Sequence, residues 1–288
     1  MSLRSRIAAA RDRLADAGVD RRQAAFDAEI LAREALGWDR AKLLAWQSDP
    51  PPPGFDAAFE RLVARRLRRE PVTTILGRRE FMGLEFAVTS DVLSPRPESE
   101  MLIEEAVACL DGEARQADMT IADVGTGSGC LAVCLAREFP RARVIATDVS
   151  AAALAVAAGN ARRHGVAERI EFRHASLLDG VTTPLPLIVS NPPYVATGDI
   201  RGLTPEVREY EPGVALDGGP DGLDLIRDLL REARRALEPR GWLVFEFGFG
   251  QEDRVREAIA RGGLELVRIR HDLQGIARTA VTRKMPNA

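Results

Sequence analysis

The sequence of 288 residues has only three cysteines, Cys109, Cys130 and Cys134. A sparse, odd set argues against a disulfide framework and fits a reducing compartment. Cys130 and Cys134 would lie one turn apart on a helix, but two thiols alone make a poor metal site. We therefore predict that the cysteines are small side chains of the core, and we expect no metal centre.

Long apolar runs and an excess of charge of one sign are also missing. No run approaches the ~18 residues that a membrane span needs, and no secretory signal precedes the first helical pattern. The net charge is −3, so the chain has no global basic field for nucleic acid. We therefore expect a soluble cytoplasmic protein, a monomer, with no membrane and no stable nucleic acid as partners.

Histidine is scarce as well. The three histidines, His164, His174 and His271, are scattered. The sequence therefore offers no Ser-His-Asp arrangement for nucleophilic catalysis. We predict that each histidine is structural or exposed.

The first part of the chain, residues 1–70, has apolar positions at helical spacing and predicts an all-helical N-terminal domain. One helix is expected from about Arg21 to Leu36, ending at Gly37, and another follows Pro50–Pro53. That second helix ends in five arginines, Arg61, Arg65, Arg66, Arg68 and Arg69. They form either a docking face for an acidic or RNA-bearing partner or a solvated face that covers apolar neighbours. We favour the solvated face.

A change of pattern after the helical part predicts a linker. The stretch Val72–Leu93 holds Gly77 and Gly83 between β-type runs, which is typical of a β-hairpin. We therefore expect residues 71–97 to be a hairpin linker and residues 98–288 to form a second domain.

Strand and helix patterns alternate in this second domain, which predicts an α/β fold with a mostly parallel sheet. The expected strands are Thr120–Val124, Arg143–Thr147, Arg169–Arg173, Leu187–Ser190, Trp242–Phe247, Leu264–Ile269 and Thr279–Arg283. Helices are expected between most of them, for example at Cys130–Phe139 and Ala151–His164. Ligands of such sheets bind beyond the carboxyl ends of the strands, so the site should lie there.

A glycine-rich turn follows the first of these strands, Asp123-Val124-Gly125-Thr126-Gly127-Ser128-Gly129. Glycines permit a tight turn and a close approach of backbone N–H groups to a ligand. The spacing G-x-G-x-G differs from the G-x-G-x-x-G of dinucleotide-binding proteins. Because Asp123 at the strand end can bind a charged amino group, we predict a cofactor site here.

Asp148 ends the second strand, about 20 positions after the turn, where an acidic residue typically binds two ribose hydroxyls. A carboxylate suits this diol because it accepts two hydrogen bonds. The alternative is that Asp148 caps the helix starting near Ala151, but Ser150 can provide that cap. We favour ribose binding.

The apolar strand Leu187–Ser190 is followed by Asn191-Pro192-Pro193-Tyr194. Prolines fix the backbone and leave carbonyls without competing local donors. We predict that the Asn191 side-chain oxygen and the Pro192 carbonyl accept hydrogen bonds from one planar NH2 group, while Tyr194 stacks on its flat group. The alternative is a strand that is simply terminated by prolines.

Such a grip suits methyl transfer, a displacement at carbon in which nucleophile, methyl and leaving group lie in line. Positioning can supply up to ~7–11 kcal/mol of the barrier. An amide nitrogen is a poor nucleophile, and hydrogen bonds from its NH2 to two acceptors return electron density to it. No strong base is needed beforehand, because the nitrogen becomes acidic only as it gains the methyl.

The glycine turn, Asp148 and Asn191–Tyr194 together resemble class I methyltransferases that modify planar nitrogens. Over nearly the whole chain, the sequence resembles the HemK/PrmC family, the glutamine methyltransferases of peptide chain release factors. Further segments that fit this family are Gly77–Phe81, Pro95–Glu98, Tyr210–Pro212, Ala215-Leu216, Gly218-Gly219, Glu246–Gly248 and Asp272–Gly275.

This resemblance implies a class I, Rossmann-like, seven-stranded sheet with a terminal antiparallel strand. It implies that the small helical domain docks the release factor. The methylated group would be the glutamine of the Gly-Gly-Gln tip that enters the peptidyl-transferase centre. The implied cofactor is S-adenosyl-L-methionine, and the product is S-adenosyl-L-homocysteine.

The resemblance also implies roles for individual residues. Cofactor binding falls to Asp123, Gly125, Thr126, Gly127, Ser128, Gly129, Asp148 and Asn191. The glutamine amide is held by Asn191, Pro192, Pro193 and Tyr194, of which Asn191, Pro192 and Tyr194 form the catalytic set. At the adenine, where an acidic residue and an aromatic are usual, we expect Ser176 to hydrogen-bond and Leu177 to sandwich the ring. Ser99 stands where Thr is usual.

Four other functions are alternatives. A related branch methylates a glutamine of a ribosomal protein. An adenine-N6 methyltransferase is another, because the motif from Asn191 to Tyr194 also suits the exocyclic amine of a flipped base, although the chain lacks a basic footprint. The G-x-G-x-G spacing disfavours a dehydrogenase. The intact segment Asn191–Tyr194, called the acceptor motif below, disfavours a non-catalytic adaptor.

Overall fold

The computed structural model describes residues 1–286 and divides into two compact units. The first unit comprises residues 1–77 and 204–210, and the second comprises residues 78–203 and the chain from Glu211 onward. Residues 204–210 therefore belong to the first unit, although their chain neighbours on both sides belong to the second. Within the described residues, no helix is long and apolar enough to cross a membrane.

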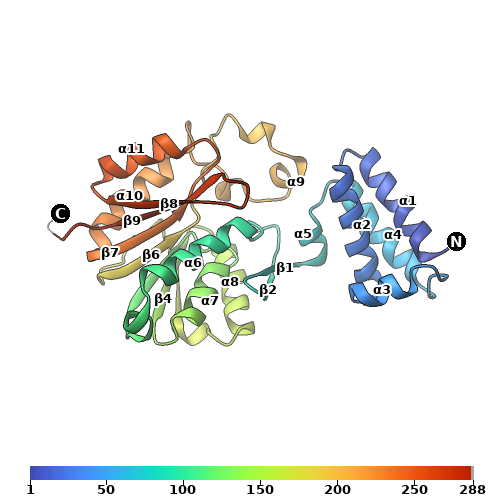
Figure 1. Cartoon of the computed structure of the whole chain (residues 1–288), viewed down its shortest axis with the longest axis horizontal. Coiled ribbons are helices and arrows are strands. Elements are labelled where there is room, and N and C mark those ends of the chain that lie inside the picture. Colours follow the sequence, from blue (N-terminus) through green and yellow to red (C-terminus); the bar gives the residue numbers. More distant parts are fainter. Residues whose placement is uncertain (287–288) are drawn as a thin grey trace. The chain divides into compact units, whose positions relative to one another are not determined.

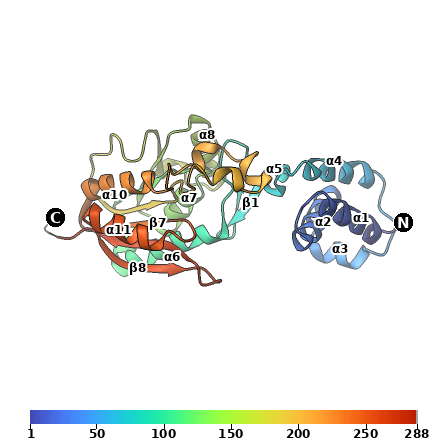
Figure 2. The ribbon, with the colours of Figure 1, turned by 90° about the horizontal axis from the view of Figure 1, so that it is seen from above.

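The first unit is helical, as the sequence predicts (Figures 1 and 2). Its helices are α1 (Leu3–Asp16), α2 (Arg21–Leu36), α3 (Arg40–Trp46), α4 (Phe55–Leu67), α5 (Val72–Leu76) and α9 (Pro205–Arg208). Asp20 caps the start of α2, and Gly37 ends it with a φ of +62°, a conformation that favours glycine. The apolar faces of α1, α2 and α4 bury Leu14, Leu31 and Val63 in a common core.

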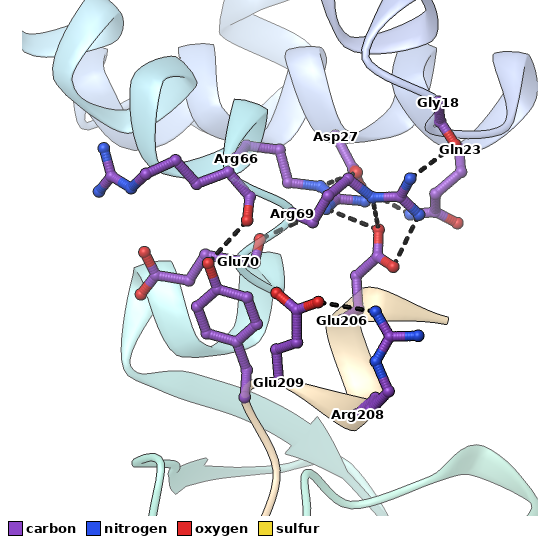
Figure 3. Close-up of polar contacts among 11 residues, drawn as sticks. Gly18, Gln23, Asp27, Arg66, Arg69, Glu70, Glu206, Arg208 and Glu209 are labelled. Carbon is purple, nitrogen blue, oxygen red and sulfur yellow. Dashed lines mark hydrogen bonds and ion pairs between the residues drawn. The ribbon is translucent and has the colours of Figure 1, made fainter. Parts of the chain in front are cut away.

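A partly buried ionic cluster lies inside this unit (Figure 3). The side chain of Arg66 is 4% exposed and donates from Nε to Asp27 Oδ2 at 2.7 Å and from Nη1 to Glu206 Oε1 at 2.9 Å. Arg69 donates to the same glutamate from Nε at 2.7 Å and from Nη2 at 2.8 Å. The cluster thus joins α2, the C-terminal end of α4 and α9 through two cations and two carboxylates.

These contacts correct both interpretations for one of the five arginines at the end of α4, Arg66. Arg66 is buried, so it belongs neither to a solvated face nor to a docking face. Arg65 is partly exposed and donates to Glu70, and Arg61 and Arg68 are exposed. The acidic partners lie in the chain itself, and Glu206 is 140 positions from Arg66, so no local pattern indicates it.

The predicted hairpin is present, but it is shorter than expected. Strands β1 (Arg78–Phe81) and β2 (Leu84–Ala87) pair antiparallel, whereas Val72–Leu76 forms α5, which ends at Gly77 with a φ of +69°. The prediction of β structure from Val72 onward is therefore wrong. The β-branched residues of this segment favour a strand, but Ile75 packs into the helical core, and tertiary packing overrides weak propensity.

The second unit contains a seven-stranded sheet of order β5-β4-β3-β6-β7-β9-β8. Its strands are β3 (Thr120–Val124), β4 (Arg143–Asp148), β5 (Ile170–His174), β6 (Leu185–Ser190), β7 (Leu237–Glu246), β8 (Glu265–His271) and β9 (Ala277–Arg283). Strands β3 to β7 are parallel to their neighbours among themselves, and β9 lies antiparallel between β7 and β8. The α/β sheet with a terminal antiparallel strand is therefore confirmed.

Both faces of this sheet are buried, because side chains alternate along each strand. In β6, Leu187 and Val189 belong to one core cluster and Ile188 belongs to the other. The first cluster is covered by α6 (Glu100–Cys109), α7 (Cys130–Glu138) and α8 (Ala151–Arg163), and the second by α10 (Asp224–Ala236) and α11 (Glu252–Gly262) (Figure 1). The layered fold therefore leaves the strand ends as the place for a site.

The cysteines are core side chains, as the sequence predicts. Cys130 and Cys134 are buried in the first cluster, and Cys109 packs against it. His164 and His174 also have structural contacts, since each ring is 2.8–2.9 Å from a backbone carbonyl oxygen.

Candidate active site

The glycine turn lies between the carboxyl end of β3 and the start of α7. Gly125, Gly127 and Gly129 have φ values of +74°, +52° and +79°, which side chains other than glycine rarely adopt. A Cβ at Gly129 would also lie 2.9 Å from the backbone of Ala157 in α8. The turn is anchored on β4, because the N–H groups of Gly125 and Thr126 both donate to the Thr147 carbonyl at 2.9 Å.

Asp123 lies fully buried beneath this turn. Its Oδ2 accepts hydrogen bonds from Thr126 Oγ1 at 2.6 Å and from Ala132 N at 3.0 Å. Its Oδ1 is buried and has no partner among the described residues. Burial raises the pKa of Asp123 to about 7. Asp123 does not itself line the cavity described below, but its neighbours Val124 and Thr126 do. The orphaned oxygen fits an ammonium group bound over the turn.

Asp148, at the end of β4, holds the turn from the other side. Its Oδ2 accepts from Gly127 N at 2.9 Å, and its Oδ1 accepts from Ser150 N at 2.8 Å. Ser150 provides the cap of α8, since its Oγ accepts from Ala153 N at 3.1 Å. Asp148 lines the cavity, and each carboxylate oxygen has a further lone pair for a ligand hydroxyl. A ribose diol therefore fits this residue.

One cavity of about 570 Å³ runs along the carboxyl ends of the strands of the second unit. Its lining includes every residue of the turn from Val124 to Ser128, Asp148, Ser176, Leu177 and the segment Asn191–Pro193. Leu177 has a φ of +48°, and its carbonyl accepts from Thr147 Oγ1 at 2.6 Å. The structure thus brings the residues predicted for the adenine, the ribose and the acceptor into one space.

The acceptor motif follows β6 and connects to a buried polar chain. Asn191 Nδ2 donates to Ser99 Oγ at 2.9 Å, and Ser99 Oγ donates to Glu246 Oε2 at 2.6 Å. The Tyr194 hydroxyl donates to the other oxygen, Glu246 Oε1, at 3.0 Å. Unlike Asn191, Tyr194 is not part of the cavity lining. Its predicted stacking on the acceptor stays a prediction, while its hydroxyl has a place in the interior.

Glu246 ends β7 and accepts two of these hydrogen bonds. The sequence did not indicate this role. Glu246 is 1% exposed, and burial raises the pKa of its carboxyl, although the hydroxyls of Ser99 and Tyr194 and the charge of Arg278 oppose this shift. Burial, followed by the negative charge of Glu246, raises the pKa of Tyr194. An acidic residue directly after the apolar run Trp242–Phe245 was the available signal, because a buried charge needs a reason.

The loop after the acceptor motif covers two of its carbonyls. A Cβ at Gly218 would lie 2.8 Å from the Pro193 oxygen, and one at Gly222 would lie 2.4 Å from the Tyr194 oxygen. Gln251 Nε2 donates to the Tyr194 oxygen at 2.8 Å. By contrast, no residue in the described part of the chain donates to the Pro192 carbonyl. The loop thus holds the motif and leaves the Pro192 carbonyl for another partner.

Comparison with known proteins finds a matching family model in each of the two units. The family described as PrmC N-terminal domain matches residues 7–77, and the family described as methyltransferase small domain matches residues 99–204. The release factor glutamine methyltransferase of Cereibacter sphaeroides is 45% identical over 282 residues, 98% of this chain and 98% of that protein. That of Geobacter sulfurreducens is 44% identical over 251 residues, 87% of this chain and 85% of that protein.

A solved structure supports the fold. The methyltransferase from Pyrococcus furiosus is similar with a TM-score of 0.54 and 18% identity, covering 77% of this chain and 98% of that chain. At this low identity the similarity concerns the arrangement of strands and helices alone.

Proposed function

The chain belongs to the family of release factor glutamine methyltransferases, and from this premise we propose that it methylates the side-chain amide nitrogen of a glutamine in peptide chain release factors. The methyl donor of this family is S-adenosylmethionine. The glutamine that we propose as acceptor is that of the Gly-Gly-Gln motif. The reaction is assigned to the cavity of the second unit.

The observation that supports this proposal best is the continuity of the cavity. Its lining runs from Asp148 and the glycine turn to Asn191 and Pro192 without leaving the second unit. Methyl transfer requires the acceptor nitrogen and the donor to share one enclosed space in a fixed orientation. The lining meets that requirement, because it contains a carboxylate suited to a ribose diol, Asp148, and two oxygens suited to an amide NH2 group, those of Asn191 and Pro192.

Residues of the turn would hold the cofactor. Backbone N–H groups of the segment Gly125–Gly129 and the carboxylate of Asp148 are proposed to bind it, and Asp123 Oδ1 is proposed to attract its ammonium group. Ser176 and Leu177 are proposed to contact the adenine. The cofactor supplies a methyl group on a positively charged sulfur, which is displaced with the bonding electron pair as the new bond forms.

Asn191 and Pro192 are proposed to act on the acceptor. Each offers one oxygen to the NH2 of the glutamine, so that the amide nitrogen presents its face to the methyl group. The new carbon–nitrogen bond leaves a positive charge on that nitrogen, and its proton then leaves to water. The two acceptors stabilise this charge most in the transition state, which is the condition for faster reaction.

The first unit is proposed to bind the release factor. We propose that residues 1–70 form the core of this recognition domain, that residues 71–97 link it and that residues 98–288 carry out the transfer. Because release factors act in translation, we propose the cytoplasm as the place of action. We also propose that the chain acts as a monomer, without nucleic acid as a stable partner.

The proposal is tested with labelled S-adenosylmethionine and purified release factor, in a wild-type and a Gly-Gly-Ala version. Label on the first alone is expected. Equal label on both would place the acceptor elsewhere, and label on neither would contradict the proposal. As a separate check of the cofactor residues, Asp148→Ala is expected to weaken cofactor binding about 10- to 100-fold, since it removes hydrogen bonds to a charged group. Equal affinity in calorimetry would remove Asp148 from the site.

A further inference from the structure

The side-chain amide of Asn191 has two ends of similar shape and opposite chemistry. The oxygen accepts hydrogen bonds and the NH2 group donates them. Only the oxygen can serve a glutamine NH2, because two NH2 groups facing each other have no acceptor between them. The site therefore needs a device that selects one of the two orientations of Asn191.

Such a device is present in the contacts of Ser99. This residue directly precedes α6 without a side-chain capping hydrogen bond, is 3% exposed and lies between Asn191 and Glu246. A serine hydroxyl has one hydrogen to donate. When that hydrogen points to the Glu246 carboxylate, Ser99 has only lone pairs for Asn191. Asn191 must then turn its NH2 group toward Ser99.

The Glu246 carboxylate fixes the direction of the whole chain. An ionised carboxylate accepts hydrogen bonds and cannot donate them, and both of its oxygens are used, one by Ser99 and one by Tyr194. The backbone holds Glu246 near Asn191, because β7 pairs with β6. Phe245, the residue before Glu246, lies opposite Ser190, the residue before Asn191. The orientation of Asn191 therefore follows from a charge that is two hydrogen bonds away.

We propose that Ser99 and Glu246 are positioning residues that direct Asn191 Oδ1, rather than Nδ2, toward the amide of the substrate. This inference rests on the proposed function, and it adds the reason why the acceptor asparagine is polarised correctly before substrate arrives. No described residue donates to Asn191 Oδ1, so this oxygen keeps its lone pairs for the substrate. Neither positioning residue needs to touch the reacting atoms.

The test compares three variants of the full chain. Ser99→Ala removes the hydroxyl, Ser99→Thr retains it, and Thr282→Val is the control. Thr282 is also fully buried, and its Oγ1 donates to the Leu243 carbonyl at 3.1 Å within the sheet. The control thus removes a buried hydroxyl that has no connection with Asn191. For each variant, kcat, KM for the release factor and affinity for S-adenosylmethionine are measured.

Ser99→Ala is expected to lower kcat about 10- to 100-fold, because an unanchored amide samples both orientations and loses an interaction of the transition state. Affinity for the cofactor should stay within about twofold, since the contacts of the turn are unchanged. Ser99→Thr is expected to restore most of kcat, and Thr282→Val to leave it unchanged. A kcat of Ser99→Ala equal to that of the wild type would overturn the inference. An equal loss in Thr282→Val would do so as well.

A second readout does not depend on activity. The side-chain NH2 resonances of Asn191, assigned with Asn191→Asp, should shift in Ser99→Ala and stay in place in Thr282→Val. Unchanged resonances in Ser99→Ala would contradict the hydrogen bond on which the inference depends. If the wild type fails to methylate release factor while these resonances respond as expected, the proposed function fails and the orientation of Asn191 stands.

Discussion

Each unit buries a carboxylate, Asp27 in the first and Glu246 in the second, and the groups that surround these two carboxylates differ. In the first unit, Asp27 and Glu206 face the guanidinium groups of Arg66 and Arg69. In the second unit, Glu246 receives hydrogen bonds from two neutral hydroxyl groups. The pKa of Glu206 is lowered to about 2, where its hydrogen bonds and ion pairs with arginine outweigh burial, whereas burial raises the pKa of Glu246.

This difference separates a structural charge from an orienting one. A carboxylate matched by a cation is stabilised in place, and removing the cation leaves a buried charge uncompensated. A carboxylate matched by hydroxyls keeps much of its desolvation cost, and in return it dictates where those hydroxyls point. The first arrangement suits the joining of α9 to the helical unit, and the second suits the acceptor site.

The largest effect is expected from Arg66→Met. This substitution leaves Asp27 with Gln23 alone, whose Nε2 donates to Oδ1 at 2.6 Å. We expect the free energy of unfolding to fall by about 3–5 kcal/mol, the usual cost of breaking a buried pair. Urea denaturation measures it. The matched control is Arg13→Met, which breaks an exposed pair with Glu60 and should cost less than about 1 kcal/mol. Equal losses would remove the distinction between the two pairs.

The next largest effect is expected at the end of the orienting chain. Asn191→Ala removes one of the two proposed acceptors of the glutamine NH2. We expect kcat to fall about 100- to 1000-fold, as for other deletions of one transition-state hydrogen bond, with cofactor affinity retained. Single-turnover transfer to release factor and calorimetry with S-adenosylmethionine measure the two quantities. Unchanged turnover would exclude Asn191 from the acceptor role.

A smaller effect is expected from the charge of Glu246. Because burial raises its pKa above the ordinary value of 4.5, kcat should rise with pH as the group ionises and the direction of the chain is fixed. The neighbouring charges are Arg278, which lowers this pKa, and Glu98, which raises it. Ser99 and Tyr194 face the carboxyl as donors.

Glu246→Gln should abolish that rise and lower kcat about tenfold at neutral pH, a change near 1.4 kcal/mol. The glutamine amide can meet its two hydroxyl neighbours in either orientation, so the loss is partial. The free energy of unfolding of the Glu246→Gln variant should differ from that of the wild type by less than about 1 kcal/mol, since the substitution removes a charge that has no salt-bridge partner. A large loss of stability with an unchanged pH profile would make Glu246 a structural residue like Asp27.

The smallest effect is expected from the titration of Glu206. Its pKa is lowered in the folded chain, so the stability that it contributes is present above about pH 4.5 and is lost as the pH falls toward about 2. The side chain is partly exposed, and we expect a contribution of about 1 kcal/mol after screening by solvent. The difference in unfolding free energy between the wild type and Glu206→Gln should shrink over this range. A constant difference would mean that the charge contributes nothing.

Local signals explain what could be predicted from the sequence. Apolar runs mark the strands of the second unit, closely spaced glycines mark the turn, and Asp148 stands at the end of one of these runs. The parallel order then brings Asp148 and Asn191 to one edge, because the carboxyl ends of parallel strands meet there. The fold class was therefore accessible before the structure, as was part of the cavity lining, including Gly125, Asp148 and Asn191.

Only the tertiary structure decided which distant groups meet. Residues 204–210 belong to the first unit, where Glu206 contacts Arg66, and no periodicity relates these two residues. The helix at Val72–Leu76 follows from the burial of Ile75, and the inward place of the Tyr194 hydroxyl follows from Glu246. The sequence by itself determined the strands, the glycine turn and the segment Asn191–Tyr194 at the end of a strand, because neighbouring residues encode them. The side-chain orientation of Asn191, by contrast, involves single hydrogen bonds between segments far apart in the chain, and these exist only once the chain is packed.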